Sequence, residues 1–444
     1  MGKLPRAPVR NLLVHPTRDS PATTPPDLDD VRWLTSAAAI DILTQATALT
    51  GELTTRLKQL RGSLSPERAR LVMQQVELRQ RARDKFSAAE RMFFTPTGLE
   101  QSTDEIVATY KAARFAGRTS VYDLCSGIGG DLVALAAVAE ITGGTATGFD
   151  RDPIAAEFAA ANARVFGCAN VSIRADDVTS LDLAACDAWH LDPDRRPQGR
   201  RTTRVELHEP SAEAIDEMLA RNPRAAIKLA PAATWPEAWN ERAEWEWISR
   251  GRQCRQLVAW FGGLATHAGQ HRATILSGNI LSGIPGQGSG SAAHRLQFTA
   301  HTFVGPPGDE VPVASAVGRF IYEPDAAVLA AKLSGALAAA HNLSTVAAGI
   351  AYWTGDTPID DPLLACFEVE TVLPFDIKKL KALLRERHAG PLEIKVRGLD
   401  QNPAELRKRL DPQGTLPYTI LLTRIDKRVT AIVGKRRGRD AFDG

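Results

Sequence analysis

The stretch "DLCSGIGGDL" at residues 123–132 places one carboxylate, Asp123, directly before a loop with three glycines in four positions. Such a loop allows the backbone to approach a ligand closely. A phosphate loop of the form GxxxxGK[ST] is excluded, because no lysine follows these glycines. The dinucleotide pattern GxGxxG fits Gly127 and Gly129, but Leu132 stands at the third glycine position. The glycines alone therefore leave the ligand open.

Four carboxylates, each at the end of a predicted strand, indicate which ligand the glycine loop binds. Asp123 precedes the loop, Asp150 ends "GFD", Asp177 ends "RADD", and Asp192 ends "HLD". An acid before the loop suits the cationic amino group and sulfonium of S-adenosylmethionine, whereas it would repel a pyrophosphate. Asp150 is placed to bind ribose hydroxyls in either an NAD or an S-adenosylmethionine site, and Asp177 can accept a hydrogen bond from an adenine amino group. Together these residues predict S-adenosylmethionine as the cofactor.

The fourth strand ends in Asp192, Pro193 and Asp194, where a methyl acceptor would lie. Methyl transfer is an in-line displacement, so the enzyme must mainly align the nucleophile and remove its hydration. We predict these three as catalytic residues, with Asp192 as the main contact to the acceptor. The motif lacks the second proline and the aromatic residue of the Asn-Pro-Pro-aromatic motif, so there is no ring to stack a flipped base. This disfavours methylation of the adenine N6 atom.

Cysteine chemistry is also disfavoured. Methylation at carbon 5 of a pyrimidine needs a cysteine nucleophile beside the acceptor. Cys125 lies in the predicted cofactor loop, and Cys254 lies just before a late strand, so neither fits that role. A nitrogen or oxygen acceptor that needs no covalent intermediate remains.

Five arginines follow within ten residues of Asp194, and we predict Arg195, Arg196 and Arg200 as substrate-binding residues. Guanidinium groups bind phosphates through paired hydrogen bonds, which suits a nucleic-acid acceptor. The alternative is that two of the arginines neutralise the local carboxylates and the others lie in solvent.

The elements that must position these side chains alternate between strands and helices from about residue 118. Such alternation at short intervals predicts an α/β fold with a parallel, doubly wound sheet, whose ligands bind beyond the carboxyl ends of the strands. The predicted strands are 119–126, 145–150, 171–177, 187–194, 225–231, 255–262 and 272–278, and the helices between the first of them are 131–141 and 153–167.

Helical patterns precede this core and an α+β pattern follows it. A helix from Ser65 has that serine as its N-cap and proline at its first position. Residues 283–295 are rich in Gly and Ser and indicate an exposed loop or linker. After about residue 311, strands alternate with two basic helices, which Asp376 and Asn402 are predicted to cap.

The stretch "DLCSGIGGD…GFDRDP…NARVFG…DD…LDPDRR" resembles class I RNA methyltransferases, including the trimethylguanosine-synthase-like group. The chain from about 30 to 440 resembles bacterial class I methyltransferases that carry a C-terminal THUMP-like domain, with matches that include "KFSAAERMFFTPTGLEQST" and "YEPDAAV". The resemblance implies a Rossmann-like sheet, adenosylmethionine binding and an RNA substrate. We predict an N-terminal helical domain (29–96), the methyltransferase domain (97–310) and the THUMP-like domain (311–444), after a disordered tail (1–28) that is rich in Pro and Thr.

The same resemblance assigns the cofactor contacts. It implies that Asp123, Cys125, Gly127 and Gly129 surround the methionine part of the cofactor, that Asp150 binds the ribose, and that Asp177 lies near the adenine. It further implies that the segment 95–103 closes over the cofactor, with Gln101 as a contact. The alternative for this segment is an ordinary helix start, because Thr and Glu are common near helix N-termini.

Composition and charge limit the compartment and the partners. No apolar run is long enough for a membrane span and the N-terminus lacks a signal-peptide core, while five cysteines without CxxC spacing argue against a disulfide framework or a metal site. We therefore expect a reduced, cytoplasmic protein with no membrane or metal partner. The net charge is +2, yet residues 56–91 hold ten Lys and Arg against four Asp and Glu, and residues 376–444 hold seventeen against nine. Basic ends favour RNA as the partner; a small-molecule or protein methyltransferase, or a catalytically silent RNA-binding protein, stays open.

Overall fold

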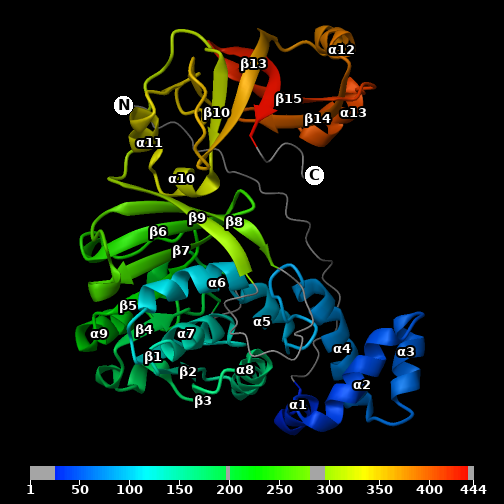
Figure 1. The fold of residues 1–444 in the computed structure, drawn as a ribbon, viewed down its shortest axis with the longest axis vertical. Coiled ribbons are helices and arrows are strands. Elements are labelled where there is room, and N and C mark those ends of the chain that lie inside the picture. The colour runs from blue at the N-terminus through cyan, green and yellow to red at the C-terminus, as the bar shows by residue number, and fades with distance from the viewer. Residues whose placement is uncertain (1–25, 197–200, 281–295, 439–444) are drawn as a thin grey trace. The chain divides into compact units, whose positions relative to one another are not determined.

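The structure is a computed structural model, and it describes residues 26–196, 201–280 and 296–438 (Figure 1). The predicted tail (1–28) lies outside these ranges except for its last residues, which include Leu28 at the start of the first helix. The predicted linker 283–295 lies outside them entirely. The chain divides into two compact units, residues 1–74 and 75–444, and the division lies inside the helix α4.

The first unit is helical. Its elements are α1 (Leu28–Leu34), α2 (Ala37–Ala48), α3 (Leu53–Leu60) and the first half of α4 (Pro66–Ala82). Local hydrogen bonds set where two of them begin: Asp27 accepts from the backbone N–H of Asp29 at 2.8 Å, and the Ser65 hydroxyl accepts from the N–H of Arg68 at 3.2 Å. The predicted cap at Ser65 is therefore confirmed.

The second unit contains a nine-stranded sheet in the order β3-β2-β1-β4-β5-β7-β6-β8-β9. The first five strands in this order pair in parallel, which confirms the predicted α/β class, whereas β7 runs antiparallel to both β5 and β6. The strands are β1 (Ser120–Leu124), β2 (Thr145–Phe149), β3 (Val171–Arg174), β4 (Ala188–Leu191), β5 (Ala225–Leu229), β6 (Ala243–Arg250), β7 (Gln253–Phe261), β8 (His271–Ile280) and β9 (Leu296–Gly305).

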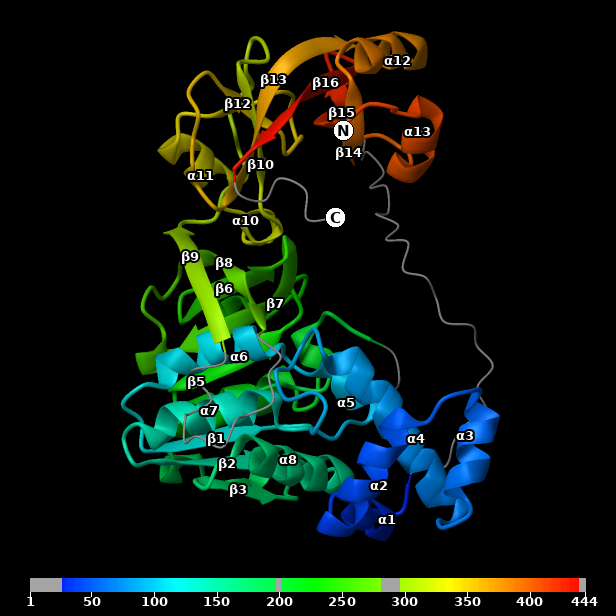
Figure 2. The same ribbon diagram turned by 45° about the vertical axis from the view of Figure 1, so that its right-hand side comes forward.

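Helices cover both faces of this sheet (Figure 2). Apolar side chains of α6 and α7 pack with alternate residues of β1, β4 and β5 on one face, and α9 packs on the opposite face. Side chains alternate along a strand, so one strand supplies both cores. The helices are α5 (Pro96–Gln101), α6 (Glu105–Ala112), α7 (Gly130–Glu140), α8 (Pro153–Phe166) and α9 (Ala212–Arg221), with short 3₁₀ turns at Ala113–Phe115, Val178–Ser180, Leu183–Ala185, Val205–Leu207, Glu237–Trp239 and Gly262–Leu264.

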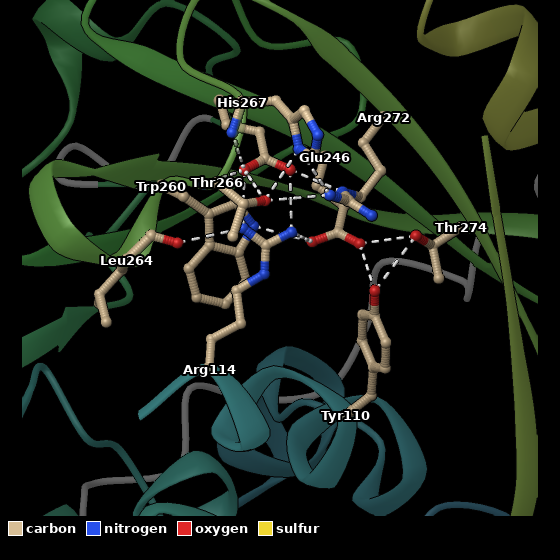
Figure 3. Close-up of polar contacts among 10 residues, drawn as sticks. Tyr110, Arg114, Glu246, Trp260, Leu264, Thr266, His267, Arg272 and Thr274 are labelled. Atoms are coloured by element: carbon tan, nitrogen blue, oxygen red, sulfur yellow. Dashed lines mark hydrogen bonds and ion pairs between the residues drawn. The ribbon is translucent and has the colours of Figure 1, made fainter. Parts of the chain in front are cut away.

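The strand β6 carries two carboxylates that the sequence pattern did not mark as buried. Glu244 and Glu246 are fully buried, and Arg114 pairs with both, at 2.9 Å from Glu244 Oε2 and 3.2 Å from Glu246 Oε2. Figure 3 shows Arg114 and Glu246 within the network of polar contacts. Glu244 also accepts from Arg272 at 2.6 Å, and Glu246 accepts from the hydroxyl of Tyr110 at 2.6 Å. This network joins the 3₁₀ turn after α6 to the sheet.

The C-terminal part of the second unit forms a seven-stranded sheet in the order β11-β12-β10-β13-β16-β15-β14. Its strands are β10 (Phe320–Pro324), β11 (Ser344–Thr345), β12 (Trp353–Gly355), β13 (Leu364–Pro374), β14 (Ala389–Val396), β15 (Leu416–Ile425) and β16 (Arg428–Arg437), and its helices are α10 (Ala326–Ala330), α11 (Ser334–Ala340), α12 (Ile377–Glu386) and α13 (Pro403–Leu410). Both predicted caps are confirmed, because Asp376 accepts from the N–H of Lys378 and Asn402 accepts from that of Ala404. Within the described ranges, no helix is long and apolar enough to cross a membrane.

Candidate active site

A cavity of about 750 Å³ lies at the carboxyl ends of β1, β2 and β4. Its lining residues come from six segments, which lie within 95–103, 123–131, 150–155, 176–179, 192–195 and 209–214. The predicted cofactor residues Asp123, Cys125, Gly127, Asp150, Asp177 and Gln101 all line it, as do Asp192, Pro193, Asp194 and Arg195. The fold therefore gathers residues that are up to about a hundred positions apart in the sequence.

The glycine loop bends sharply between β1 and α7. Gly129 has a φ of +83°, and a Cβ there would lie 3.3 Å from the Cα of Ala159 in α8, so glycine allows these two helices to approach. Gly127 also has a positive φ, and its N–H donates to Asp150 Oδ2 at 2.8 Å. Burial raises the pKa of the Cys125 thiol well above its ordinary value, so this cysteine stays neutral. Gly129 thus shapes the loop but is not among the cavity-lining residues.

Asp123 is the most buried carboxylate of the cavity, with 1% of its surface exposed. Its Oδ1 lies 2.7 Å from His190 Nδ1, whereas its Oδ2 is buried and has no hydrogen-bond partner among the described residues. Burial raises the pKa of this carboxyl, and the hydrogen bond from His190 offsets only part of the effect. An unpartnered buried carboxylate oxygen is costly unless a ligand supplies a donor.

A network of buried polar groups holds Asp123 in place. His190 Nε2 lies 3.1 Å from Lys111 Nζ, and Lys111 pairs with Asp131 at 2.8 Å. Because an ammonium group can only donate, Nε2 accepts and the proton of His190 is on Nδ1, facing Asp123. Burial opposes ionisation of Asp131, but the charge of Lys111 lowers its pKa overall. The hydroxyl of Thr103, between α5 and α6, donates to Asp131 at 2.6 Å and is the last group of this polar network.

Asp150 and Asp177 line the cavity from the ends of β2 and β3. Asp150 is held by two backbone N–H groups, those of Gly127 at 2.8 Å and Asp152 at 2.9 Å. Asp177 is exposed, and its Oδ1 accepts from the N–H of Thr179 at 2.9 Å. Both carboxylates therefore already cap local turns, and their contacts to ribose and adenine stay predictions.

The predicted catalytic and substrate-binding residues that follow β4 differ from one another in their contacts. Asp192 Oδ2 lies 2.5 Å from Lys228 Nζ. Asp194 pairs through its backbone with Glu209, and its side chain accepts from the N–H of Arg196 at 2.9 Å, so it shapes the turn. Arg196 itself forms an ion pair with Glu100 at 2.6 Å, which agrees with the alternative of charge neutralisation. Arg200 lies outside the described residues.

Sequence reasoning missed three site residues, Lys228, Lys85 and His190. Lys228 lies in β5, and its Nζ donates to Asp192 and to the carbonyl oxygen of Gln101 at 3.1 Å. Lys85 donates to the carbonyl oxygens of Leu99 at 2.7 Å and of Ser102 and Glu100 at 3.2 Å. The available signal was one cation inside the otherwise apolar strand "AAIKLAP", because a charged residue is rarely buried without a partner.

Comparison with known proteins decides the family. Two proteins of Mycobacterium tuberculosis, from strains H37Rv and CDC 1551, are each named an uncharacterized S-adenosylmethionine-dependent methyltransferase. Each is 31% identical to this chain over 372 residues, which cover 81% of this chain and 94% of the relative. The chain belongs to the S-adenosylmethionine-dependent methyltransferases.

Two further matches describe the domains of this methyltransferase. The family described as THUMP domain-like matches residues 364–436, from β13 to β16, which confirms the predicted C-terminal domain type. A protein from Porphyromonas gingivalis W83, described as a methyltransferase, has a crystal structure that superposes with a TM-score of 0.69 at 18% identity, covering 93% of this chain and 98% of that one. This likeness shows the fold.

The residues present fit the cofactor of a methyltransferase. The unpartnered Oδ2 of Asp123 would accept from the amino group of the methionine part, and Asp150 would accept from the ribose hydroxyls. When bound, S-adenosylmethionine supplies a methyl group on a sulfonium. The chain's own task is to exclude water and to align the methyl acceptor. The contact of Asp192 with that acceptor stays a prediction. No group of His, Cys, Asp and Glu side chains suited to a metal ion occurs in the part of the chain that the structure describes.

Proposed function

We propose that this methyltransferase methylates RNA, either tRNA or rRNA, in the cytoplasm, at a nitrogen or oxygen atom and without a covalent enzyme intermediate. The observation that carries the proposal is a second, larger cavity of about 1730 Å³, called here the basic groove. Gln101, Ser102, Thr103 and Arg195 line both this groove and the cofactor cavity. An acceptor in the groove therefore reaches the reacting end of the cofactor cavity.

The groove is strongly basic. From residues 75–310 it is lined by nine Lys and Arg against three Asp and Glu, and the cations are Arg81, Arg83, Lys85, Arg195, Arg201, Lys228, Arg250, Arg252 and Arg255. The THUMP-like domain adds Lys395, Arg407 and Arg436 against Asp325 and Glu393. A concave surface with one sign of charge concentrates a polyanion, and the phosphate backbone of RNA is such a polyanion.

Two arginines beside the acceptor end carry no carboxylate partner among the described residues, namely Arg195 and Arg201. Burial lowers the pKa of Arg195, and the positive charges of Arg201 and Arg196 lower it further, although Asp192 opposes them. Cations crowded in this way are stabilised by an added anion, and a guanidinium group binds a phosphate through two hydrogen bonds. We therefore assign Arg195 and Arg201 to phosphate binding.

The cysteines support a mechanism without a covalent intermediate. A thiol acts as a nucleophile only as the thiolate. Burial raises the pKa of Cys254 to about 12 and raises that of Cys125 well above its ordinary value. Cys254 does not line either cavity, and Cys125 faces the cofactor side. The carbon-5 chemistry of pyrimidines therefore lacks its nucleophile here.

The test uses tritiated S-adenosylmethionine and total RNA from a strain that lacks the gene, beside RNA from the parent strain. We expect label only in the deletion-strain RNA, because the parent RNA already carries the methyl group. Asp192→Ala is the inactive control, and its cofactor affinity is measured by calorimetry to show that the site is intact. Cofactor binding without label in any RNA would favour a small-molecule or protein acceptor instead. Binding of RNA should also fall steeply with ionic strength, whereas turnover of a small molecule should not.

A further inference from the structure

Asp192 and Lys228 form a paired donor and acceptor at the point where the cofactor cavity meets the basic groove. Their side chains are 25% and 8% exposed, and their atoms Oδ2 and Nζ lie 2.5 Å apart. Asp192 lines the cofactor cavity, and Lys228 lines the groove. Among the described residues, Lys228 is the only side chain that bonds to the Asp192 carboxylate, so Oδ1 is free to accept a hydrogen bond.

A second ammonium group stands behind this pair. Lys85 and Lys228 both donate to carbonyl oxygens of the turn 99–102, which separates the two cavities. Burial, and then the charge of Lys228, lower the pKa of Lys85 to about 8, although Asp104 opposes them. The acceptor end therefore places two ammonium groups near the one carboxylate, Asp192, that Lys228 contacts directly.

This set of groups suits one kind of acceptor atom. An exocyclic amine carries two hydrogens and a single lone pair, so it needs acceptors for both hydrogens while its lone pair attacks the methyl group. A lysine ammonium aimed at that nitrogen would compete for the same lone pair. A hydroxyl oxygen has one hydrogen and two lone pairs, so it can donate to Asp192, accept from Lys228 and still attack.

The lining of the cavities points away from a flipped base. No Phe, Tyr, Trp or His occurs among the described residues that line either cavity. Enzymes that act on an extruded base hold it by stacking between aromatic or apolar side chains. Aliphatic side chains such as Leu229 and Ile275 line the groove, but its described lining offers no aromatic ring for stacking. Gln256 lines the groove, is 3% exposed, and its Nε2 has no partner among the described residues. This donor, with Arg195 and Arg201, suits the oxygens of a sugar–phosphate backbone.

We propose that the acceptor is a hydroxyl oxygen held between Asp192 and Lys228, and that in RNA it is the ribose 2′-hydroxyl. This inference rests on the proposed RNA substrate. The oxygen forms a bond to the methyl carbon while the carbon–sulfur bond breaks, and that electron pair stays on sulfur. The hydroxyl proton passes to Asp192, and the ammonium of Lys228 stabilises the negative charge that develops on oxygen. Both residues touch the acceptor, whereas Lys85 is a positioning residue that acts through the turn 99–102.

The deciding experiment is alkaline hydrolysis of RNA labelled as above. A 2′-O-methyl group blocks cleavage of the adjoining phosphodiester, so label should appear in alkali-stable dinucleotides. Label in mononucleotides would overturn the hydroxyl assignment while leaving RNA methylation intact. Absence of label from the RNA would instead refute the proposed function, so the two failures are distinguishable. Once the target nucleotide is mapped, a synthetic RNA with 2′-deoxyribose there should accept no methyl group, and one with 2′-deoxyribose at the next nucleotide should still be methylated.

Lysine variants test the role of the pair. We expect Lys228→Met to lower kcat by about 100-fold or more with little change in KM, as for loss of a group that acts in the transition state. Lys427→Met, on the exposed turn between β15 and β16, is the matched control and should keep full activity. Cofactor affinity, measured by calorimetry, verifies folding. If Lys228→Met fails to bind the cofactor, Lys228→Arg keeps the charge and should restore binding. Unchanged kcat in folded Lys228→Met would overturn the assignment.

Discussion

Arg114→Met tests how far the fold depends on the buried network of Figure 3. Arg114 is 15% exposed, and the carboxylates of Glu244 and Glu246 are fully buried. Removing one partner of a buried ion pair costs about 3–5 kcal/mol, because the remaining charge is left uncompensated. Glu244 keeps Arg272 at 2.6 Å, and Glu246 keeps three neutral donors, so we expect the lower end, about 3 kcal/mol.

The assay is thermal unfolding of the full chain followed by circular dichroism. A domain of this size loses about 2–4 °C of Tm per kcal/mol, so the expected fall is about 6–12 °C. Arg242→Met is the matched control, because Arg242 pairs with Asp216 at 3.0 Å while the two side chains are 48% and 39% exposed. Exposed pairs contribute about 0–1 kcal/mol. Equal falls in Tm for the two variants at neutral pH would refute the reasoning.

The pH dependence has a definite sign. Burial acts to raise the pKa of Glu244, but hydrogen bonds from Arg114 and Arg272 outweigh it and hold this pKa below its ordinary value of 4.5. Such a carboxylate stabilises the fold above its unfolded-state pKa, and the stabilisation is lost as pH falls through the folded-state value. Without Arg114 the folded-state pKa rises, so the difference in Tm between wild type and variant should shrink as the pH falls below 4.5. A difference that grew on acidification would contradict the assignment of charge.

Four further predictions concern ligands. Asp123→Asn should weaken S-adenosylmethionine binding by about 10- to 150-fold, the range for a lost hydrogen bond to a charged group, and calorimetry measures it. Burial raises the pKa of Asp123, so this carboxyl takes up a proton while the pH is still above its ordinary value of 3.8. The affinity of the wild type for S-adenosylmethionine should therefore begin to fall at a pH above 3.8, and a flat profile would contradict this. Asp150→Ala should reduce the same affinity, whereas retained affinity would remove Asp150 from the site. The pair Arg195→Ala and Arg201→Ala should lower the salt dependence of RNA binding by about 1.4 in the log–log slope, at ~0.7 for each phosphate contact on a single strand, and an unchanged slope would exclude both residues.

The parallel core was predictable because local signals agree with the tertiary arrangement. The glycine loop, the strand-end aspartates and the caps at Asp376 and Asn402 each follow from nearby residues. The strand β6 was not among the predicted strands, although "AEWEWISR" alternates tryptophan with glutamate as a half-buried strand does. That alternation implies a solvent-facing side for the glutamates. Both glutamates are buried instead, since Arg114 reaches them from more than a hundred residues away. No local pattern reports such a partner.

The candidate site divides in the same way. Aspartates at the ends of parallel strands meet at one edge of the sheet, so their convergence could be expected from the order of the elements. Lys228 and Lys85 could not be assigned, because their partners are carbonyl oxygens of the turn 99–102 and one carboxylate on the neighbouring strand. His190 is likewise defined by the groups above and below it, Asp123 and Lys111. These roles exist only after the sheet has formed.

The turn 99–102 has a thermodynamic consequence. It borders both cavities, and two lysines from distant parts of the chain hold its carbonyl oxygens. A ligand on one side that changes the position of this turn changes the affinity on the other side, and linkage requires that the factor be the same in both directions. Spent cofactor and methylated product would then influence each other's release through a single peptide segment. This coupling would change the rate of product release rather than the rate of the chemical step.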